Sequence, residues 1–427
     1  MATHKPRRQA FEVFLDAPEL GPIQKVGTLF RHEIRTDLPA SFEYDKDWLH
    51  GDRVFMLDPR LELWTGPQYP PAGATAFGIF MDSAPDRWGR VLMERRESVR
   101  ALHEGRKART LRELDFLLGV NDLTRTGALR FRDMEGGSFL DASENAAPPF
   151  ANLRELADVS RRIESADSES MPEYEQWLAM LMAPGTSLGG ARPKANFTDE
   201  DGRLWLAKFP AQEDRYDVGA WEFLVNQLAR RAGIRVPDAR LEELSARHRT
   251  YCAGRFDRIG NGRRMFASAM TLLERRDGDK ESSYLDLAQF VSENGAADRI
   301  EEELEQLFRR VVFNVLVGNR DDHLRNHAFI REPSGWRLSP AYDVNPVPAK
   351  SEHALRLDES TAVPNLDTAL STSEYYRIES SRAKKIMEEV KGEVATWRTE
   401  ANHLGLARSE IELVGRAFGI GYSGAPE

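Results

Sequence analysis

The sequence predicts an α+β protein with two strand-rich regions followed by a helical C-terminal region. Short alternating stretches separated by Gly and Pro run to about residue 79 and return between residues 194 and 256, a pattern typical of β-strands. After about residue 284 the apolar residues recur at helical spacing instead. A chain of 427 residues is long enough for two or three domains. The predicted domains are residues 1–135, 150–258 and 259–427.

The N-terminal domain is expected to begin with strands. These are predicted at Phe11–Leu15, Val26–Phe30 and Ala40–Tyr44, with further short strands to about Ile79. The pattern changes to a helix over Arg87–Leu102 and returns to a strand over Gly127–Arg132. Residues 133–149 are rich in small residues and proline and lack periodicity, so they are predicted to form a linker.

The second region opens with a glycine-rich turn over Gly185–Lys194. A hairpin is predicted next, formed by Ala195–Phe197 and Leu204–Phe209, and then a helix over Trp221–Ala232 that Gly233 closes. Two apolar stripes predict core helices in the C-terminal region. They comprise Ile300, Leu304, Leu307, Phe308, Val311, Val312 and Val315, and Ile386, Met387, Val390, Val394 and Trp397.

The overall composition is that of an ordinary globular protein, with 41% hydrophobic and 30% charged residues. The net charge of -10 argues against nucleic acid as the main direct partner, although it leaves a local basic patch open. A single cysteine, Cys252, excludes an internal disulfide and a multi-cysteine metal site. No stretch approaches the roughly 20 apolar residues of a membrane span, and the start lacks an apolar signal core. We therefore expect a cytoplasmic protein.

The segment GNRDDHLRN, residues 318–326, carries the first candidate for chemistry. Asp321 and Asn326 have four residues between them, as do the catalytic Asp and the magnesium-binding Asn of protein kinases. One carboxylate can accept the proton of a substrate hydroxyl, while a neutral amide oxygen holds Mg²⁺ without neutralising that carboxylate. A solvated polar turn after a helix would give the same pair, so the pair alone does not discriminate.

Asp343, in LSPAYDVNP, follows a strand-like stretch 17 residues after Asn326. Kinases place a second metal-binding carboxylate in a similar downstream position. The flanking residues, Tyr342 and Val344, depart from the Asp-Phe-Gly pattern of eukaryotic kinases. An Asp in a Pro-bounded turn is the alternative interpretation.

Lys208 lies in the apolar stretch LWLAKFP, where a buried lysine is costly unless it meets an anion. Kinases use such a strand lysine to hold the α- and β-phosphates and pair it with a helical Glu. Glu222, on the next predicted helix, is the candidate partner. A lysine whose ammonium group reaches solvent from an edge strand remains the alternative.

The glycine-rich turn would let backbone amides approach phosphates closely. It is neither a Walker A motif nor GxGxxG, so its position before the Lys208 strand carries the argument. Glycine-rich turn, strand Lys, helical Glu, Asp-x4-Asn and Asp occur in the order found in kinases. This order predicts a bilobal protein-kinase-like fold.

The motifs SLGGARPK, LAKFP, RFDR, GNRDDHLRNHAF and LSPAYDVNP resemble the HipA family of bacterial toxin kinases. The N-terminal FEYDKDWL and FGIFMDSAPDRWGR resemble that family's strand-rich N-terminal domain, so the resemblance covers roughly residues 10–420. It implies an N-terminal HipA-type domain (1–135), a kinase N-lobe (150–258) and a helical kinase C-lobe (259–427).

The resemblance also implies the site residues. Asp321 matches the catalytic base, Asn326 and Asp343 match the Mg²⁺ ligands, and Ser187 matches an autophosphorylated serine that switches the kinase off. A phosphoserine there would place about two negative charges beside the ATP phosphates. The implied ATP contacts are Gly189, Gly190, Ala191, Arg192, Pro193, Lys194, Lys208, Gly254, Arg255, Phe256, His323, Leu324, Arg325, Asn326, Tyr342 and Asp343.

By the same resemblance, the cofactors are ATP and Mg²⁺, and the substrate is a translation component such as an aminoacyl-tRNA synthetase. A small helix-turn-helix antitoxin of the HipB type would be the partner, and any DNA contact would be indirect. The sequence departs from some relatives at Gly254, at Arg192 and Pro193, and over Ala267–Leu273. These departures bear on the adenine contact, the phosphate loop and the choice of substrate.

Three alternatives stay open at this point. A pseudokinase or corepressor would keep the fold without catalysis, although every base and metal position is filled. A metal-dependent phosphohydrolase would use Asp321, Asp322, His323 and Asp343 as ligands, but leaves Lys208 unexplained. Phosphorylation of a lipid or small molecule is compatible with the same catalytic loop.

Overall fold

In the computed structural model, residues 8–32, 40–142, 147–165, 168–182, 190 and 192–419 are described. They divide into two compact units. The first comprises residues 1–206 and 257–267, and the second comprises residues 207–256 and 268–427. The boundaries of the three domains predicted from the sequence differ from those of the two units, and the three domains remain a prediction.

The first unit is built on an antiparallel four-stranded sheet with the order β3-β2-β1-β4. Along β1 the side chains of Phe11, Val13 and Leu15 are buried at alternate positions, because successive side chains of a strand point to opposite faces. The strands are β1 (Arg8–Leu15), β2 (Gln24–His32), β3 (Ser41–Tyr44) and β4 (Leu129–Asp133). The strands predicted before residue 45 and near residue 130 are confirmed.

The prediction of further short strands up to Ile79 is wrong. Between Tyr44 and Ile79 the chain forms α1 (Lys46–Leu49), loops and the start of α2 (Gly78–Met81), with a single isolated bridge from Phe42 to Gln68. Pro and Gly punctuate this stretch too often for a ladder of hydrogen bonds to extend. Apolar side chains such as Leu57 and Leu61 are buried there without regular pairing, whereas Trp64 and Tyr69 are exposed.

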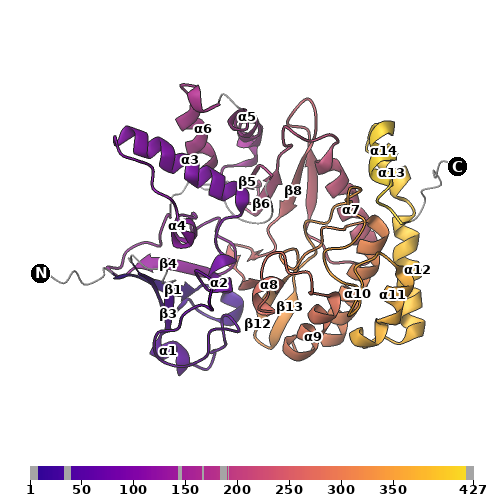
Figure 1. The fold of residues 1–427 in the computed structure, drawn as a ribbon, viewed down its shortest axis with the longest axis horizontal. Coiled ribbons are helices and arrows are strands. Elements are labelled where there is room, and N and C mark those ends of the chain that lie inside the picture. The colour runs from indigo at the N-terminus through magenta and orange to yellow at the C-terminus, as the bar shows by residue number, and fades with distance from the viewer. Residues whose placement is uncertain are drawn as a thin grey trace, which may run out of the picture. The chain divides into compact units, whose positions relative to one another are not determined.

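Helices and short strands complete the first unit (Figure 1). The predicted helix over Arg87–Leu102 is confirmed as α3 (Arg87–His103), which begins where the carboxylate of Asp86 accepts a hydrogen bond from Gly89 N. The others are η1 (Pro18–Leu20), α4 (Glu113–Leu118), η3 (Phe150–Asn152), α5 (Leu153–Ile163), η4 (Ser168–Ser170), α6 (Tyr174–Met182), β5 (Lys194–Thr198), β9 (Arg258–Ile259) and β10 (Gly262–Arg263).

Two strands cross the limit between the units. Strand β6 (Leu204–Lys208) forms the predicted hairpin with β5 and enters the second unit at Ala207. Strand β11 (Phe266–Ser268) returns the chain to that unit at Ser268. In the second unit lie α7 (Val218–Arg231), β7 (Ala239–Glu242) and β8 (Thr250–Gly254), as the sequence predicts.

The rest of the second unit is mainly helical (Figure 1). Helix α10 (Ile300–Val317) is buried over most of its surface and packs against α9 and α12. The second apolar stripe is divided, because α12 ends at Val394 and α13 begins at Trp397. The elements are α8 (Ala269–Leu272), α9 (Tyr284–Asn294), β12 (Ala328–Glu332), β13 (Gly335–Leu338), α11 (Leu366–Ser371), η5 (Ser373–Tyr376), α12 (Ser380–Val394), α13 (Trp397–His403) and α14 (Arg408–Gly415).

Candidate active site

Lys208, at the end of β6, holds its ammonium group between two carboxylates. Its Nζ lies 2.6 Å from Glu222 Oε1 on α7 and 2.8 Å from Asp343 Oδ1. The lysine side chain is only 11% exposed. Burial opposes the charged form, but the two carboxylates outweigh burial and raise the pKa of Lys208 above its ordinary value. Lys208 is therefore a buried, permanently charged cation.

Helix α7 places Glu222 opposite this lysine. The helix begins where the Asp217 carboxylate accepts a hydrogen bond from Ala220 N, and its apolar face, with Trp221 and Leu224, is buried. Tyr251 of β8 supports the lysine from another side, with its ring centroid 5.8 Å from Nζ. The predicted Lys208–Glu222 contact is thus present, whereas Tyr251 was not anticipated.

Asp343 has a left-handed backbone, with φ of 56°. Such a conformation is unfavourable for a residue with a side chain and occurs often at functional sites. The preceding Tyr342 fixes the segment, because its hydroxyl donates to the Arg325 carbonyl at 2.6 Å and its ring lies 5.3 Å from that of Phe256. Tyr342 thereby links the end of the predicted hinge, the catalytic loop and Asp343.

The predicted catalytic loop, residues 318–326, starts where α10 ends, at Gly318. This residue has φ of 68°, and a Cβ built on it would lie 2.2 Å from the carbonyl oxygen of Ala417. Only glycine satisfies both conditions without movement of the backbone. The turn carries the chain directly from a buried helix to Asp321.

Asp321 is paired with a residue that the sequence did not indicate. Its Oδ1 forms an ion pair with Lys350 Nζ, and the two side chains are about half exposed, at 55% and 48%. Arg320 holds this part of the chain by donating to the Lys350 carbonyl at 2.8 Å. Lys350 lies 29 residues after Asp321, so no local spacing could have identified it.

Asp322 has a different role from its neighbour. It is 3% exposed, and its Oδ2 accepts hydrogen bonds from Tyr284 Oη at 2.6 Å, Asn314 Nδ2 at 2.7 Å and His327 Nε2 at 2.7 Å. Burial would raise the pKa of Asp322, yet His327 and these hydrogen bonds hold it below its ordinary value. The carboxylate is committed to the interior and anchors the loop from within.

Asn326 closes the loop and is 7% exposed. Its Nδ2 lies 3.4 Å from the Asp321 carbonyl oxygen, so the amide nitrogen is turned toward the loop and the amide oxygen is the atom suited to a metal. Oxygen ligands from Asn326 and Asp343 fit Mg²⁺, which usually keeps waters and phosphate oxygens as its remaining ligands. Across the residues described, no group of three or more His, Cys, Asp or Glu forms a metal cluster.

The remaining catalytic-loop candidates differ in exposure. Leu324 is buried, and the exposed Arg325 forms an ion pair with Asp277 at 3.0 Å. Among the residues that the structure describes, no hydrogen-bond partner lies at the buried Nδ1 of His323. All three also line a cavity described below.

The predicted hinge ends strand β8. Gly254 N donates to the Asp238 carbonyl at 2.8 Å. Arg255 is 6% exposed. The predicted adenine contacts of Gly254, Arg255 and Phe256 stay predictions.

The glycine-rich turn is described only in part. Ser187, Gly189 and Ala191 lie outside the described residues. Gly190 has φ of 84°, and Lys194 is fully buried in the first unit, where its Nζ forms an ion pair with Asp86 and lies 3.3 Å from the Gly190 carbonyl oxygen. Asp86, which also caps α3, was not predicted to contact this turn.

Arg192 is half-buried in a segment outside the helices and strands, and Pro193 directly precedes β5. The predicted phosphate contacts of Gly190, Arg192, Pro193 and Lys194 are not tested by this geometry. Within the part of the chain that the structure describes, no helix is long and apolar enough to cross a membrane.

Comparison with known protein families finds a match to about half of the chain, from the glycine-rich turn to α13. Residues 186–397 match the HipA-like C-terminal domain. The serine/threonine-protein kinase toxin HipA of Shewanella oneidensis is 24% identical over 269 residues, which cover 54% of this chain and 59% of that protein. The Sinorhizobium fredii protein Y4dM is 30% identical over 162 residues, 34% of this chain and 37% of its own length. The matches therefore span about a third to three fifths of these relatives.

The fold extends the likeness to nearly the whole chain. The structure of Shewanella oneidensis HipA, solved with HipB and operator DNA, superposes with a TM-score of 0.63. It covers 95% of this chain and 94% of that one at 18% sequence identity. The predicted α+β, kinase-like fold is confirmed.

Proposed function

The chain belongs to the HipA family, and from this premise we propose that it is an ATP- and Mg²⁺-dependent serine/threonine protein kinase. The observation that carries the proposal is the buried Lys208, held by Glu222 and Asp343 in the same unit as the Asp321–Asn326 loop. A charged lysine, two carboxylates and an amide supply the parts that phosphoryl transfer requires.

Each residue then has one task. Lys208 binds the α- and β-phosphates of ATP, and Glu222 keeps the ammonium in place. Asp321 accepts the proton of the acceptor hydroxyl while that oxygen bonds to the γ-phosphorus and the bond to the ADP oxygen breaks. Lys350 releases Asp321 when the acceptor arrives and then lies beside the transferred phosphoryl group.

Asn326 and Asp343 would hold Mg²⁺, which neutralises developing charge on the phosphate oxygens when it is bound. The carboxylate of Asp343 already contacts Lys208, so one side chain joins the metal position to the phosphate-binding lysine. The left-handed backbone at Asp343 maintains that orientation.

The biological setting that we propose is a toxin–antitoxin pair. The partner would be a helix-turn-helix protein of the HipB type, through which DNA contact would be indirect. The acceptor would be a protein of the translation machinery, such as an aminoacyl-tRNA synthetase. Self-phosphorylation at Ser187 would switch the kinase off, because a phosphate beside the ATP phosphates repels them.

The phosphohydrolase alternative is disfavoured by Asp322. That mechanism needs Asp322 as a metal ligand, but its carboxylate is buried and accepts three hydrogen bonds through one oxygen. Withdrawing it would remove the carboxylate acceptor that the hydroxyl of Tyr284 and the amide of Asn314 share in the interior.

The test is incubation of the purified full chain with labelled ATP and Mg²⁺ beside an Asp321→Ala variant. Labelling of the wild type alone supports the proposal. Absence of labelling together with absence of an ATP-dependent shift in melting temperature would overturn it. If ATP shifts the melting temperature without labelling, mass spectrometry at Ser187 distinguishes a protein that is already phosphorylated, and Ser187→Ala should abolish self-labelling while transfer to other proteins continues.

A further inference from the structure

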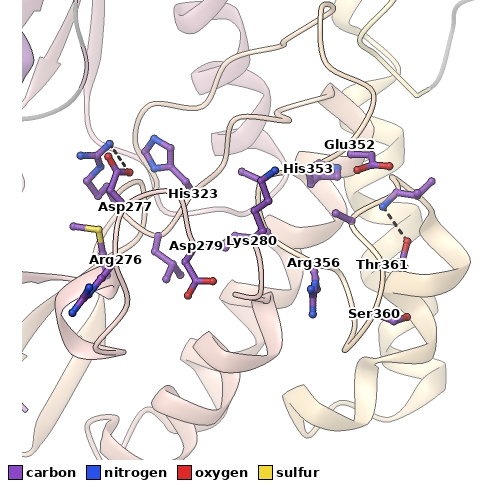
Figure 2. A pocket seen from close by; sticks show the side chains of 18 residues that line it. Arg276, Asp277, Asp279, Lys280, His323, Glu352, His353, Arg356, Ser360 and Thr361 are labelled. Carbon is purple, nitrogen blue, oxygen red and sulfur yellow. Dashed lines mark hydrogen bonds and ion pairs between the residues drawn. The ribbon is translucent and has the colours of Figure 1, made fainter. Parts of the chain in front are cut away.

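The second unit contains a cavity of about 570 Å³ that the functional assignment has not used (Figure 2). Met270 of α8 and three stretches of chain line it: residues 276–280 after α8, residues 323–325 of the predicted catalytic loop, and residues 352–356 with 360–363. In Figure 2 Lys280 lies near the centre of the view, with Asp277 and His323 to one side and Glu352 and Thr361 to the other.

The cavity adjoins the proposed catalytic base. One wall begins at His323, two residues after Asp321, and another begins at Glu352, two residues after Lys350. Since Asp321 and Lys350 form an ion pair, the two walls approach each other at the base itself. The lining therefore begins two residues from Asp321 on one wall and two residues from its partner Lys350 on the other.

Backbone hydrogen bonds hold the walls of this cavity together. Residues 353–362 fold back on themselves, with His353 N donating to the Ala362 carbonyl at 2.9 Å and Leu357 N donating to the Thr361 carbonyl at 2.7 Å. Two backbone hydrogen bonds tie Arg356 to the start of α9, at Ser282 and Tyr284, each 3.0 Å long. His353 Nδ1 also contacts the Asn319 carbonyl oxygen at 3.1 Å, which joins this wall to the catalytic loop.

The charges in the cavity favour an anion. Its lining carries Arg276, Lys280, Arg325 and Arg356 against Asp277, Asp279 and Glu352. Asp277 is paired with Arg325 at 3.0 Å, and Asp279 with Arg275 outside the lining at 3.4 Å. In contrast, neither Lys280 nor Arg356 has a carboxylate at ion-pair distance among the described residues. The guanidinium group of Arg356 donates to a backbone carbonyl, that of Glu359, at 3.2 Å.

We propose that this cavity binds an acidic segment of the acceptor protein, with Lys280 and Arg356 contacting carboxylates beside the hydroxyl that is phosphorylated. The inference rests on the proposed kinase function and adds the chemistry of its substrate. A protein segment fits better than nucleic acid, because its carboxylates can be spaced to contact Lys280 and Arg356 and to avoid Glu352, whereas a phosphate backbone carries a negative charge at every nucleotide. Alternating contacts with side chains of both signs suit a polypeptide.

The first experiment measures binding by fluorescence anisotropy on the full chain. The probe is a short labelled peptide with a central serine and Glu on both sides, compared with the same peptide carrying Gln. The Glu peptide should bind more tightly, and Lys280→Glu should weaken it about three- to tenfold, because an attraction becomes a repulsion. Arg356→Gln should weaken it less. The exposed Lys384 of α12 supplies the control, and Lys384→Glu should leave binding unchanged.

Equal binding of the Glu and Gln peptides, or equal effects of Lys280→Glu and Lys384→Glu, would overturn the inference. Tighter binding of a single-stranded RNA oligonucleotide at the same residues would also overturn it in favour of a nucleic-acid site.

The second experiment adds Mg²⁺ and labelled ATP and separates this inference from the kinase proposal. Preferential labelling of the Glu peptide, reduced by Lys280→Glu while self-labelling persists, supports the assignment. Self-labelling without any preference between peptides removes the acceptor site and leaves the kinase. Loss of all labelling removes the kinase proposal, and the acceptor role falls with it.

Discussion

Replacement of Asp322 by alanine tests whether the catalytic loop is anchored from the interior. Three donors converge on its Oδ2, from Tyr284, Asn314 and His327, at 2.6, 2.7 and 2.7 Å. Alanine removes their common acceptor and leaves no room for bulk water, because the Tyr284 and His327 side chains are themselves buried. Each of these groups would then lose a hydrogen bond to a charged partner.

The expected cost can be estimated from this geometry. A hydrogen bond to a charged group contributes about 1.5–3 kcal/mol, and removal of one partner from a buried ion pair costs about 3–5 kcal/mol. Since the three donors share one oxygen, their contributions overlap, and we expect Asp322→Ala to lower the free energy of unfolding by about 3–5 kcal/mol. Asp322→Asn keeps an oxygen acceptor at that position and should cost about 1–2 kcal/mol.

The assay is urea unfolding followed by circular dichroism, with Asp238→Ala as the control. Asp238 is 66% exposed, and its ion pair with Arg230 is on the surface, so its removal should change the free energy of unfolding by less than about 0.5 kcal/mol. An Asp322→Ala protein as stable as the Asp238→Ala protein would refute the reasoning. The reasoning would also be refuted if Asp322→Asn lowered the free energy of unfolding as much as Asp322→Ala does.

The pH dependence supplies an independent check on the same carboxylate. Because the folded pKa of Asp322 lies below the ordinary 3.8, its contribution to stability is present above the unfolded pKa and is lost as the pH falls through the folded value. The wild type should therefore lose stability below about pH 4 more steeply than Asp322→Asn. Parallel acid unfolding curves for the two proteins would contradict this assignment.

Three further predictions concern other residues of the second unit. Lys208→Met should reduce phosphoryl transfer from ATP by about a hundredfold or more. Because the pKa of Lys208 is raised in the folded state, the lysine stabilises the fold below the unfolded pKa of 10.5, and this contribution is lost as the pH rises through the folded value. Lys350→Ala should slow phosphoryl transfer about tenfold and change the free energy of unfolding by less than about 0.5 kcal/mol. The transfer rate of Lys350→Arg should lie closer to that of the wild type, and an unchanged rate in Lys350→Ala would contradict the role of Lys350. Gly318→Ala should lower the free energy of unfolding by more than about 2 kcal/mol, whereas Gly392→Ala in α12, where a Cβ meets nothing within 4 Å, should raise it by about 0.5–1 kcal/mol.

The local residue pattern was sufficient to predict most of the helices and strands. Helices α3 and α7 and the hairpin β5–β6 follow their predicted positions, because periodicity and turn residues report directly on backbone conformation. The error between Tyr44 and Ile79 arose where apolar residues are buried without pairing. Burial alone does not imply a strand, since pairing depends on partners that are distant in the sequence.

In the candidate site, too, some features followed from the sequence and others did not. The sequence by itself determined the order of Lys208, Glu222, Asp321, Asn326 and Asp343, because the proposed phosphoryl transfer needs those chemical groups and each has a recognisable local setting. It could not assign different roles to the adjacent carboxylates of Asp321 and Asp322, which have the same chemistry.

Only the tertiary structure separated those two carboxylates, since it buries Asp322 under Tyr284 and leaves Asp321 half exposed. It also decided that Lys350, 29 residues downstream, pairs with Asp321. The physical reason is that spacing in the chain fixes neighbours over one turn of a helix or one hairpin, whereas charge pairing and burial depend on which distant segments the core brings together.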